Sequence, residues 1–428
     1  MSFQRYPAYR DSGVEWLGEV PAHWEVCPMK RFARFAYGEA LPADIRNEEG
    51  MVPVFGSNGV VGYHDRSNTE SPAIFIGRKG SCGALNWSDV SSFGIDTVYY
   101  VDNRSCDPDI RWMFWLLHIA ELSSVSQDTG VPGLPRDFAH ERILPRPPHE
   151  EQRLIATFLD RETARIDALV TEQEKLIDLL KEKRQAVISR AVTKGLDPQV
   201  PMKDSGIAWL GEVPAHWDVV PVSYRYEVQL GKMLDGNKIT GKNLRPYLRV
   251  FDVQWDKINI DDLPEMDFDQ EDRVRYSLRA GDLLVNEGGS YVGRSAVWRG
   301  EMEECYYQKA LHRLRPHDKM ADTAEFFLFV MENATRQGVF VAGGNQATIE
   351  HLTAEALRRY RFAFPPRQEQ EDIAAHLRRE TERYGALITE AQKAITLLKE
   401  RRAALISAAV TGRIDVRDRV AAGATEAA

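Results

Sequence analysis

The sequence predicts a mixed α/β (α+β) chain in which two long antiparallel coiled-coil helices separate two globular domains, related by a pseudo-two-fold internal repeat. Three observations predict this fold: a short tryptophan-rich block occurs twice, a long helical block occurs twice, and the regions between them combine strand-like and helix-like patterns. The length of 428 residues, about three times that of a typical ~150-residue domain, also requires more than one domain.

The repeated blocks recur at two different offsets. The segment 11–24 (DSGVEWLGEVPAHW) recurs at 204–217 with 12 of 14 positions identical, an offset of 193 residues. The segment 147–197 recurs at 365–415 with 29 of 51 positions identical, an offset of 218 residues. The regions between the blocks show little similarity, so a repeated scaffold carries two different inserts. This organisation suggests two related tasks on two targets; gene duplication with drift in the inserts is the alternative.

These blocks divide the chain into five expected segments. They are 1–146 (short block and first variable domain), 147–197 (first long helix), 198–364 (second short block and second variable domain), 365–415 (second long helix) and 416–428 (tail).

Each long block has the pattern of one continuous helix. Pro147 ends the extended segment before the first helix, and Gly195 follows its last turn as a stop signal. Apolar residues recur at steps of three and four, or of seven, which is typical of a coiled-coil seam. We expect the two helices to pair with each other, and a two-fold relation makes the pair antiparallel; the alternative is that each helix packs on its own domain. The predicted seam comprises Ile155, Leu159, Ile166, Leu169, Ile177 and Leu180 in the first helix and Ile373, Leu377, Leu387, Ile395 and Leu398 in the second.

The short block is expected to form a turn and a packed clasp, because each copy holds a proline and two tryptophans. His23 and His216 recur in it with identical neighbours. A repeated lone histidine is more often structural than catalytic, so both are assigned to packing.

Basic and polar residues beside glycines in the variable domains are the candidate DNA contacts. Their amides and guanidinium groups suit base edges and phosphates, although surface arginines are more often simply solvated. The candidates are Arg78 and Lys79 between two glycines, Arg136 in a loop before the first long helix, Arg294 after a glycine, Lys309 and Arg313 along an expected strand, and Asn345 and Gln346 in a glycine-rich loop.

Composition restricts the class of protein. The 55 basic and 64 acidic residues give a net charge of −9, with −4 in residues 25–146 and −3 in 218–364. This charge argues against coating nucleic acid through bulk positive charge but allows a focused contact surface. The four cysteines are far apart, which argues against disulfides and structural zinc. Without an apolar leader or an 18-residue apolar run, the expected setting is a reducing cytoplasm, with no membrane partner.

Signatures of catalysis are missing from the sequence. It has no Gly-x-x-x-x-Gly-Lys-Ser/Thr phosphate loop, no Asn/Asp-Pro-Pro-Tyr/Phe motif and no metal-ligand spacing. The aspartates between 261 and 272 have the pattern of a solvated acidic loop. The sequence therefore predicts recognition, with no catalytic or metal-binding residue in this chain.

The whole chain resembles the specificity subunit of type I restriction–modification enzymes. The resemblance lies in the duplicated WLGEVPAHW block, the helix starts PPHEEQRLIATFLD and PPRQEQEDIAAHL, and the segments IGRKGSCGAL and GDLLVNEGGSYVGRSA, which are similar to target recognition domains of that family.

The resemblance implies a non-catalytic subunit whose two target recognition domains each recognise half of a bipartite, asymmetric site in double-stranded DNA. The helix pair would set the spacer, and the scaffold would dock two modification (methyltransferase) subunits, with two restriction subunits when present. S-adenosylmethionine, ATP and Mg²⁺ would belong to those partners, and the complex would methylate adenine N6 and cleave DNA with ATP. Two alternatives remain open: a stand-alone DNA methyltransferase or nuclease with degenerate motifs, and a coiled-coil scaffold that binds only protein.

Overall fold

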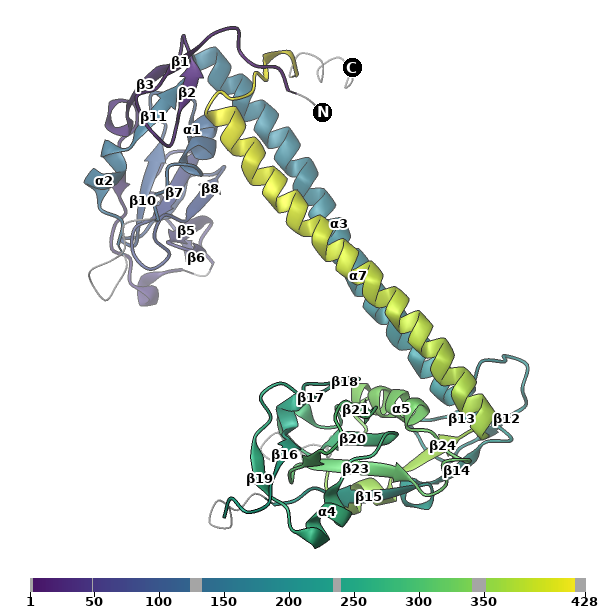
Figure 1. Cartoon of the computed structure of the whole chain (residues 1–428). Helices are drawn as coiled ribbons and strands as arrows, with labels where there is room; N and C mark the ends of the chain where they lie inside the picture. Colours follow the sequence, from purple (N-terminus) through teal and green to yellow (C-terminus); the bar gives the residue numbers. More distant parts are fainter. Residues whose placement is uncertain (1–2, 48, 124–132, 234–239, 341–351, 420–428) are drawn as a thin grey trace. The chain divides into compact units, whose positions relative to one another are not determined.

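The computed structural model forms two compact units that cut across the order of the sequence (Figure 1). Unit 1 comprises residues 1–174 and 392–428, and unit 2 comprises residues 175–391. Each unit therefore holds one variable domain, one short block and half of each long helix. The five-segment division remains a prediction. The described residues are 3–47, 49–123, 133–233, 240–340 and 352–419.

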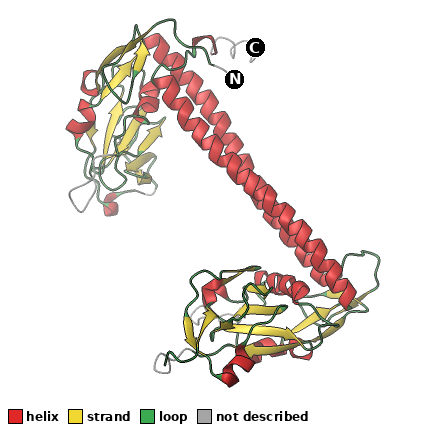
Figure 2. Ribbon diagram, viewed as in Figure 1, coloured by secondary structure: helices red, strands yellow, loops and turns green. Residues whose placement is uncertain are grey.

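The first variable domain, in unit 1, contains two small sheets beside a buried helix (Figure 2). The four-stranded sheet has the order β4-β10-β7-β8, and the three-stranded sheet has the order β6-β5-β9 with β5 and β9 parallel. Trp112, Met113 and Leu116 of α1 join the core of the four-stranded sheet. The elements are β4 (Ala36–Tyr37), β5 (Val52–Gly56), β6 (Gly59–His64), β7 (Ala73–Gly77), β8 (Leu85–Ser88), β9 (Phe93–Gly94), β10 (Val98–Asp102), α1 (Ile110–Leu117) and α2 (Arg136–Glu141).

The second variable domain, in unit 2, repeats this plan. Its four-stranded sheet has the order β15-β23-β20-β21, and its three-stranded sheet has the order β19-β16-β22 with β16 and β22 parallel. A further pair joins β17 and β18. The elements are β15 (Tyr226–Leu230), β16 (Leu244–Leu248), β17 (Val253–Gln254), β18 (Lys257–Ile258), β19 (Glu265–Asp267), α4 (Gln270–Tyr276), β20 (Asp282–Asn286), β21 (Ser295–Trp298), β22 (Tyr306–Tyr307), β23 (Leu311–Pro316), α5 (Ala324–Arg336) and α6 (Ala354–Arg359).

The two variable domains thus share a topology that their sequences do not reveal. Strand pairing gives the correspondence residue by residue: Val98 pairs with Gly77 in the first domain, as Leu311 pairs with Asn286 in the second. Buried apolar residues form the cores of both, although few of them are identical. Sheet formation needs an apolar face and not particular residues, so the topology persists while the sequence changes.

Both domains share a backbone crossing, beside the edge of the four-stranded sheet, that requires glycine. A Cβ on Gly38 would lie 1.9 Å from the carbonyl oxygen of Ile95, and a Cβ on Gly231 would lie 2.3 Å from that of Gln308. These glycines follow β4 and β15, the matching edge strands of the two four-stranded sheets. The close approach fixes the same edge in each domain.

The short blocks form the expected clasp. β1 (Tyr9–Asp11) pairs with β2 (Glu19–Pro21), and β12 (Met202–Asp204) pairs with β13 (Glu212–Pro214). The ring Nε2 of His23 lies 2.7 Å from Glu151, and that of His216 lies 2.8 Å from Glu369. Both glutamates lie at the start of a long helix, so the histidines tie clasp to helix. Two further antiparallel pairs join the start of each variable domain to its end. They are β3 (Glu25–Pro28) with β11 (Ile143–Arg146) and β14 (Asp218–Pro221) with β24 (Arg361–Phe364).

The long helices are α3 (His149–Lys194) and α7 (Arg367–Val410), and they run antiparallel within each unit (Figure 1). In unit 1, Ile155, Leu159 and Ile166 of α3 share a core with the last turns of α7, and Arg402 pairs with Asp167 at 3.0 Å. In unit 2, the last turns of α3 share a core with Ile373 and Leu377. The predicted mixed fold with a long helix pair is confirmed.

The structure differs from the predicted seam at one position in each helix. Leu169 is 39% exposed and Leu387 is 44% exposed, while the next residues, Val170 and Ile388, are half-buried. Ile166 and Ile177 are both buried and lie eleven residues apart. Only steps of four, three and four join them in strict alternation, so the seam passes through position 170 and not through 169. The intervening seam position is polar Gln173, which is also half-buried and which an apolar search passes over. Of the other predicted seam residues, Ile177 is buried, and Leu180, Ile395 and Leu398 are half-buried.

Candidate nucleic-acid interface

A tight loop after β7 presents the first candidate cations. A Cβ on Gly77 would lie 1.9 Å from the carbonyl oxygen of Ser81, so only glycine allows the chain to turn back there. The N–H of Gly77 donates to the carbonyl oxygen of Ala84 at 2.8 Å. Arg78 and Lys79 therefore leave the sheet at a fixed point, with Lys79 exposed and Arg78 half-buried.

The structure brings Arg78, Lys79 and Arg136 together around one surface hollow of about 480 Å³, although Arg136 follows them by more than fifty residues. We call this site the basic hollow; Tyr37 and Tyr99 also line it. The guanidinium carbons of Arg78 and Arg136 each lie 5.0 Å from the centre of the Tyr37 ring. Arg136 reaches the site because it opens α2 directly after Pro135. Two arginines thus flank a tyrosine that is 47% exposed.

The cations of the basic hollow are not held in ion pairs with any described residue, although the carboxylate of Asp137 also lines the hollow. Within the described residues, none of the three forms an ion pair, and Arg78 donates to the carbonyl oxygen of Asp96 at 3.1 Å. Arg136 Nε is buried without a hydrogen-bond partner among those residues. Burial, and then the adjoining Tyr37, raises the pKa of Tyr99, and the Tyr99 hydroxyl donates to the carbonyl oxygen of Leu134 at 2.9 Å. The arrangement suits an anionic or electron-rich ligand.

The matching place in the second variable domain carries different chemistry. Glu287 follows β20 as Arg78 follows β7: its N–H donates to Ala310 at 2.9 Å, as that of Arg78 donates to Thr97 at 2.8 Å. The carbonyl of Glu287 accepts from Leu352 at 2.6 Å, as that of Arg78 accepts from Leu134 at 2.9 Å. When residues are counted along each chain segment from these hydrogen-bonded pairs, Leu230 occupies the position equivalent to Tyr37, and Ala354 occupies the position equivalent to Arg136. One backbone position thus presents a cation in one domain and a carboxylate in the other.

Two of the candidate cations in the second domain lie at its surface. Lys309 is exposed, and it precedes β23 in a turn instead of lying on the strand as expected. Arg294 is half-buried, stacks 4.6 Å from the centre of the Tyr291 ring and donates to Gln254 at 2.5 Å. Lys309 is therefore accessible to a ligand, whereas the guanidinium of Arg294 is already engaged by Gln254 and Tyr291.

Arg313 lies inside the domain, and here the structure differs from the prediction. Its side chain is 2% exposed because β23 is a central strand, with Arg313 between Gln229 of β15 and Leu284 of β20. Its guanidinium donates to the carbonyl oxygens of Arg275 and Ser277 and pairs with Glu227 at 3.1 Å. Arg313 therefore stabilises the sheet and has no surface with which to contact a duplex. The predicted contacts Asn345 and Gln346 lie outside the described residues.

Sequence reasoning missed a repeated buried amide that joins each domain to its helix. Gln152, 2% exposed, accepts from the N–H of Asp109 at 2.8 Å, and Asp109 caps α1. Gln370, 0% exposed, accepts from the N–H of Thr323 at 3.0 Å, and Thr323 caps α5. The two glutamines are identical polar positions within the repeated helix starts, a signal that could have identified them. Tyr37 gave no comparable signal, because the second domain has leucine there.

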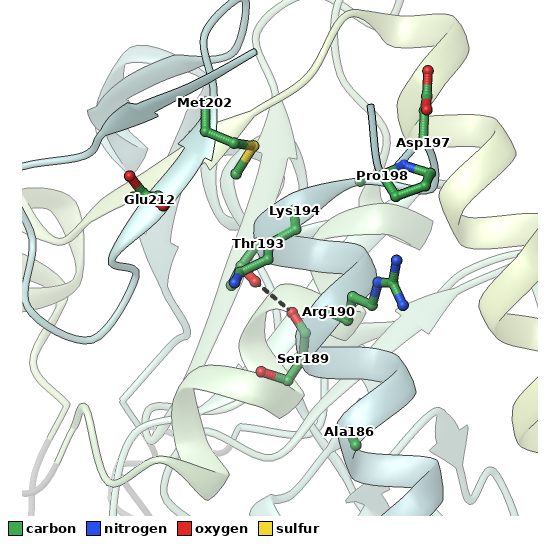
Figure 3. A pocket seen from close by; sticks show the side chains of 10 residues that line it. Ala186, Ser189, Arg190, Thr193, Lys194, Asp197, Pro198, Met202 and Glu212 are labelled. Atoms are coloured by element: carbon green, nitrogen blue, oxygen red, sulfur yellow. Dashed lines mark hydrogen bonds between the residues drawn. The ribbon is translucent and has the colours of Figure 1, made fainter. Parts of the chain in front are cut away.

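A second hollow, of about 630 Å³, lies where α3 ends against the β12–β13 hairpin (Figure 3). Arg190 and Lys194 bring positive charge to it, and Asp197 and Glu212 bring negative charge. None of the predicted DNA contacts lines it, so it is separate from the basic hollow.

The described residues contain neither a candidate metal cluster nor a helix that could span a membrane. In the part of the chain that the structure describes, no group of three or more histidine, cysteine, aspartate or glutamate side chains could hold a metal ion. No described helix is long and apolar enough to cross a membrane.

Comparisons with known proteins agree with this architecture. The family described as "Type I restriction modification DNA specificity domain" matches residues 21–178 and 228–396, one match in each half of the chain. The chain is 22% identical to the type I restriction enzyme MjaVIII specificity subunit of Methanocaldococcus jannaschii, over 93% of this chain and 95% of that protein. It is 22% identical to the EcoBI specificity subunit of Escherichia coli, over 70% of this chain and 65% of that protein.

Solved structures share the fold at low identity. A chain from a structure of complex assembly and conformational transition in the type I R-M system superposes with a TM-score of 0.68 at 14% identity, over 91% of this chain and 98% of that one. The HsdS subunit from Thermoanaerobacter tengcongensis superposes with a TM-score of 0.55 at 14% identity, over 92% of this chain and 98% of that one.

Two domains of one topology, each joined to a clasp and a long helix and differing in charge at one matched loop position, define a protein built by internal duplication. The family matches cover about three quarters of the chain. The chain belongs to the type I restriction–modification DNA specificity family: it is a specificity subunit with two target recognition domains, a DNA-recognition component without catalytic activity.

Proposed function

We propose that each variable domain recognises one half of a bipartite, asymmetric site in double-stranded DNA. The observation that carries this proposal is the pair of matched loops: the same backbone position presents Arg78 in one domain and Glu287 in the other. An arginine suits guanine O6 and N7, whereas a glutamate accepts from cytosine N4, so the two domains cannot prefer the same base at that position.

In the first domain, the proposed contacts are the three cations of the basic hollow, with Tyr37 holding Arg78 and Arg136 in place. In the second domain, they are Glu287, Arg294 and Lys309 from the described residues, together with Asn345 and Gln346. Phosphate contacts position a protein on the duplex and base contacts specify the sequence. Exposed Lys79 and Lys309 suit phosphates, while the stacked arginines suit base edges.

The long helices set the number of base pairs between the half-sites, and the repeated scaffold docks two modification subunits. Those subunits supply S-adenosylmethionine chemistry and methylate an adenine in each half-site. Two restriction subunits, when present, supply ATP- and Mg²⁺-dependent cleavage, and the assembly works in the cytoplasm. The support for these roles is the family membership and the two-fold repetition of clasp, glutamine anchor and helix.

Co-expression with the cognate modification subunit, followed by mapping of methylated adenines, tests the proposal. The expected result is one bipartite motif with two different halves and a fixed non-specific spacer. A contiguous or palindromic motif would contradict it. S-adenosylmethionine binding by the purified chain alone would favour a stand-alone methyltransferase, and no footprint in the presence of the modification subunit would favour a protein-only scaffold.

A further inference from the structure

Each variable domain meets the start of the long helix that follows it through an ion pair. In unit 1, Arg111 is the second residue of α1, and its Nε lies 2.8 Å and 3.0 Å from the two carboxylate oxygens of Asp160 on α3. The indole N–H of Trp115 donates to the same carboxylate at 2.8 Å. Asp160 therefore accepts from two groups of α1 that lie one helical turn apart.

In unit 2, the charges are reversed. Glu325 is the second residue of α5, and it pairs with Arg378 on α7. Arg378 also pairs with Asp256 at 2.9 Å, and Arg299 joins the same two acids at 2.5 Å and 3.3 Å. Arg378 is thus surrounded by carboxylates supplied by the second variable domain.

The two ion pairs occupy equivalent positions. Arg111 lies two residues after the α1 cap Asp109, and Glu325 lies two residues after the α5 cap Thr323. On the long helices, Asp160 and Arg378 each lie eight residues beyond the glutamine that holds that cap. The glutamine anchor is therefore common to both units, while the polarity of the neighbouring ion pair is opposite.

The residue one turn further along α1 and α5 also differs between the two units, in agreement with the reversed charges. Position 115 of α1 is a tryptophan that donates to Asp160, and the matching position of α5 is Phe329, which has no donor. A donor next to Arg378 would face a cation, so an apolar ring fits there. Trp115 and Phe329 thus agree with the polarity of the helix that each one meets.

We infer that this ion pair is a positional code that matches each recognition domain to its own helix. A first domain placed on α7 would bring Arg111 and the Trp115 N–H against Arg378. A second domain placed on α3 would bring Glu325 against Asp160. Like charges held together by the common glutamine anchor are unfavourable, so each domain is excluded from the other's place. The code goes beyond DNA recognition and preserves the order of the two half-sites along the chain.

The test uses one substitution in two contexts. In the native chain, Arg378→Asp removes the partner of Glu325 and Asp256, and it should lower the unfolding midpoint. In a full-length chain whose residues 218–364 are replaced by residues 25–146, the same substitution restores an acceptor for Arg111 and Trp115, and it should raise the midpoint. An effect of the same sign in both chains overturns the inference.

A double-mutant cycle in the native chain tests the inference if the chain with the exchanged domain does not fold. Arg111→Glu and Asp160→Arg should each lower the unfolding midpoint, and the double variant should recover more than half of the summed loss. Full recovery is not expected, because Arg111 also stacks 4.5 Å from the centre of the Trp87 ring. Strictly additive losses overturn the inference. Exposed Arg165 on the same helix provides the control, since Arg165→Glu should leave the midpoint unchanged.

Methylation in the assembled complex separates this code from a general contribution to folding. The two single variants in unit 1 should reduce methylation of one half-site more than fivefold over the other, with recovery in the double variant. Equal loss at both half-sites would point to folding alone and overturn the positional role. The unfolding measurements need no DNA, so a failure of the code is distinguishable from a failure of the proposed DNA recognition.

Discussion

The side-chain oxygen of Gln152 lies 2.8 Å from the backbone nitrogen of Asp109 and satisfies a donor at the start of α1. The amide nitrogen of Gln152 donates in turn to the carbonyl oxygen of Pro147 at 2.8 Å. Gln370 repeats both bonds, to Thr323 at 3.0 Å and to Pro365 at 2.9 Å. One buried side chain therefore joins the recognition domain, the proline turn and the long helix in each unit.

Replacing this amide should destabilise the unit that contains it. Gln152→Leu leaves the N–H of Asp109 and the carbonyl of Pro147 without their partner, at a cost of about 1–3 kcal/mol. Gln370→Leu should cost a similar amount. Urea unfolding of each variant measures the loss. Exposed Gln368 is the matched control, because Gln368→Leu should change the unfolding free energy by less than about 0.5 kcal/mol.

Substitutions at the matched loops should relax different halves of the recognised site. Arg78→Ala should lower discrimination at one base pair of one half-site by about 1–3 kcal/mol, because a stacked arginine suits guanine. Glu287→Ala should relax one base pair of the other half-site and leave the first unchanged. Methylation of a randomised target library by the assembled complex measures both effects. Relaxation of the same half by both variants would contradict separate recognition.

Lys79 should act differently from its neighbour. It is exposed and suits a phosphate, so Lys79→Ala should weaken binding to all sequences alike. The slope of log affinity against log salt concentration should fall by about 1. Titrations of the complex at several salt concentrations give the slope, and a base-specific loss in this variant would exclude the phosphate role.

The helix seam provides a direct comparison of adjacent residues. Val170→Ala removes a half-buried side chain that packs against the unit 1 core and should cost about 1 kcal/mol. Leu169→Ala removes a larger side chain that is 39% exposed and should cost less. Thermal unfolding compares the two variants. A greater loss at Leu169 would restore the seam that the sequence predicted.

Shortening both helices by one heptad should change the spacer and not the half-sites. Removing residues 170–176 and 388–394 together preserves the alternation of seam positions and shortens each helix by about 10 Å at 1.5 Å per residue. The spacer of the methylated motif should shorten by about 3 base pairs. Removing 170–176 alone should impair the pair, because the seams no longer match. An unchanged spacer in the matched deletion would exclude the helices as the ruler.

The isolated chain should bind DNA weakly. The two variable regions carry net charges of −4 and −3. Beyond the proposed local contacts, they therefore offer few cations that could neutralise DNA phosphates. Tight binding should require the modification subunits, which would supply much of the positive surface. Fluorescence anisotropy with and without those subunits at physiological salt measures the difference. Nanomolar, sequence-specific binding by the chain alone would contradict this expectation.

The helices and the repeat were predictable from the sequence because their signals are local and periodic. Identity between the copies marked the clasp and the helix starts, and seam residues such as Ile155 and Ile373 followed from spacing alone. Leu169 was misplaced because the choice between adjacent apolar residues depends on polar seam positions, such as Gln173, that an apolar search omits.

The candidate site was only partly predictable, because tertiary structure assembles it. Arg78 and Lys79 were indicated by their glycines, but their proximity to Arg136 depends on how α2 returns to the sheet. Arg313 has the same local pattern as a surface cation, and only the central place of β23 shows that it is buried. A side chain's chemistry is readable from one residue, whereas its surroundings are not.

The glycine crossings at Gly38 and Gly231 have a consequence for how such a protein acquires new specificity. Each fixes the backbone at a sheet edge through contact with a carbonyl oxygen, and that contact does not depend on which side chains the adjoining loops carry. A lineage can therefore replace arginine by glutamate at a reading position without rebuilding the framework beneath it. The side chains that recognise bases can change in evolution, while the backbone framework that holds them stays the same.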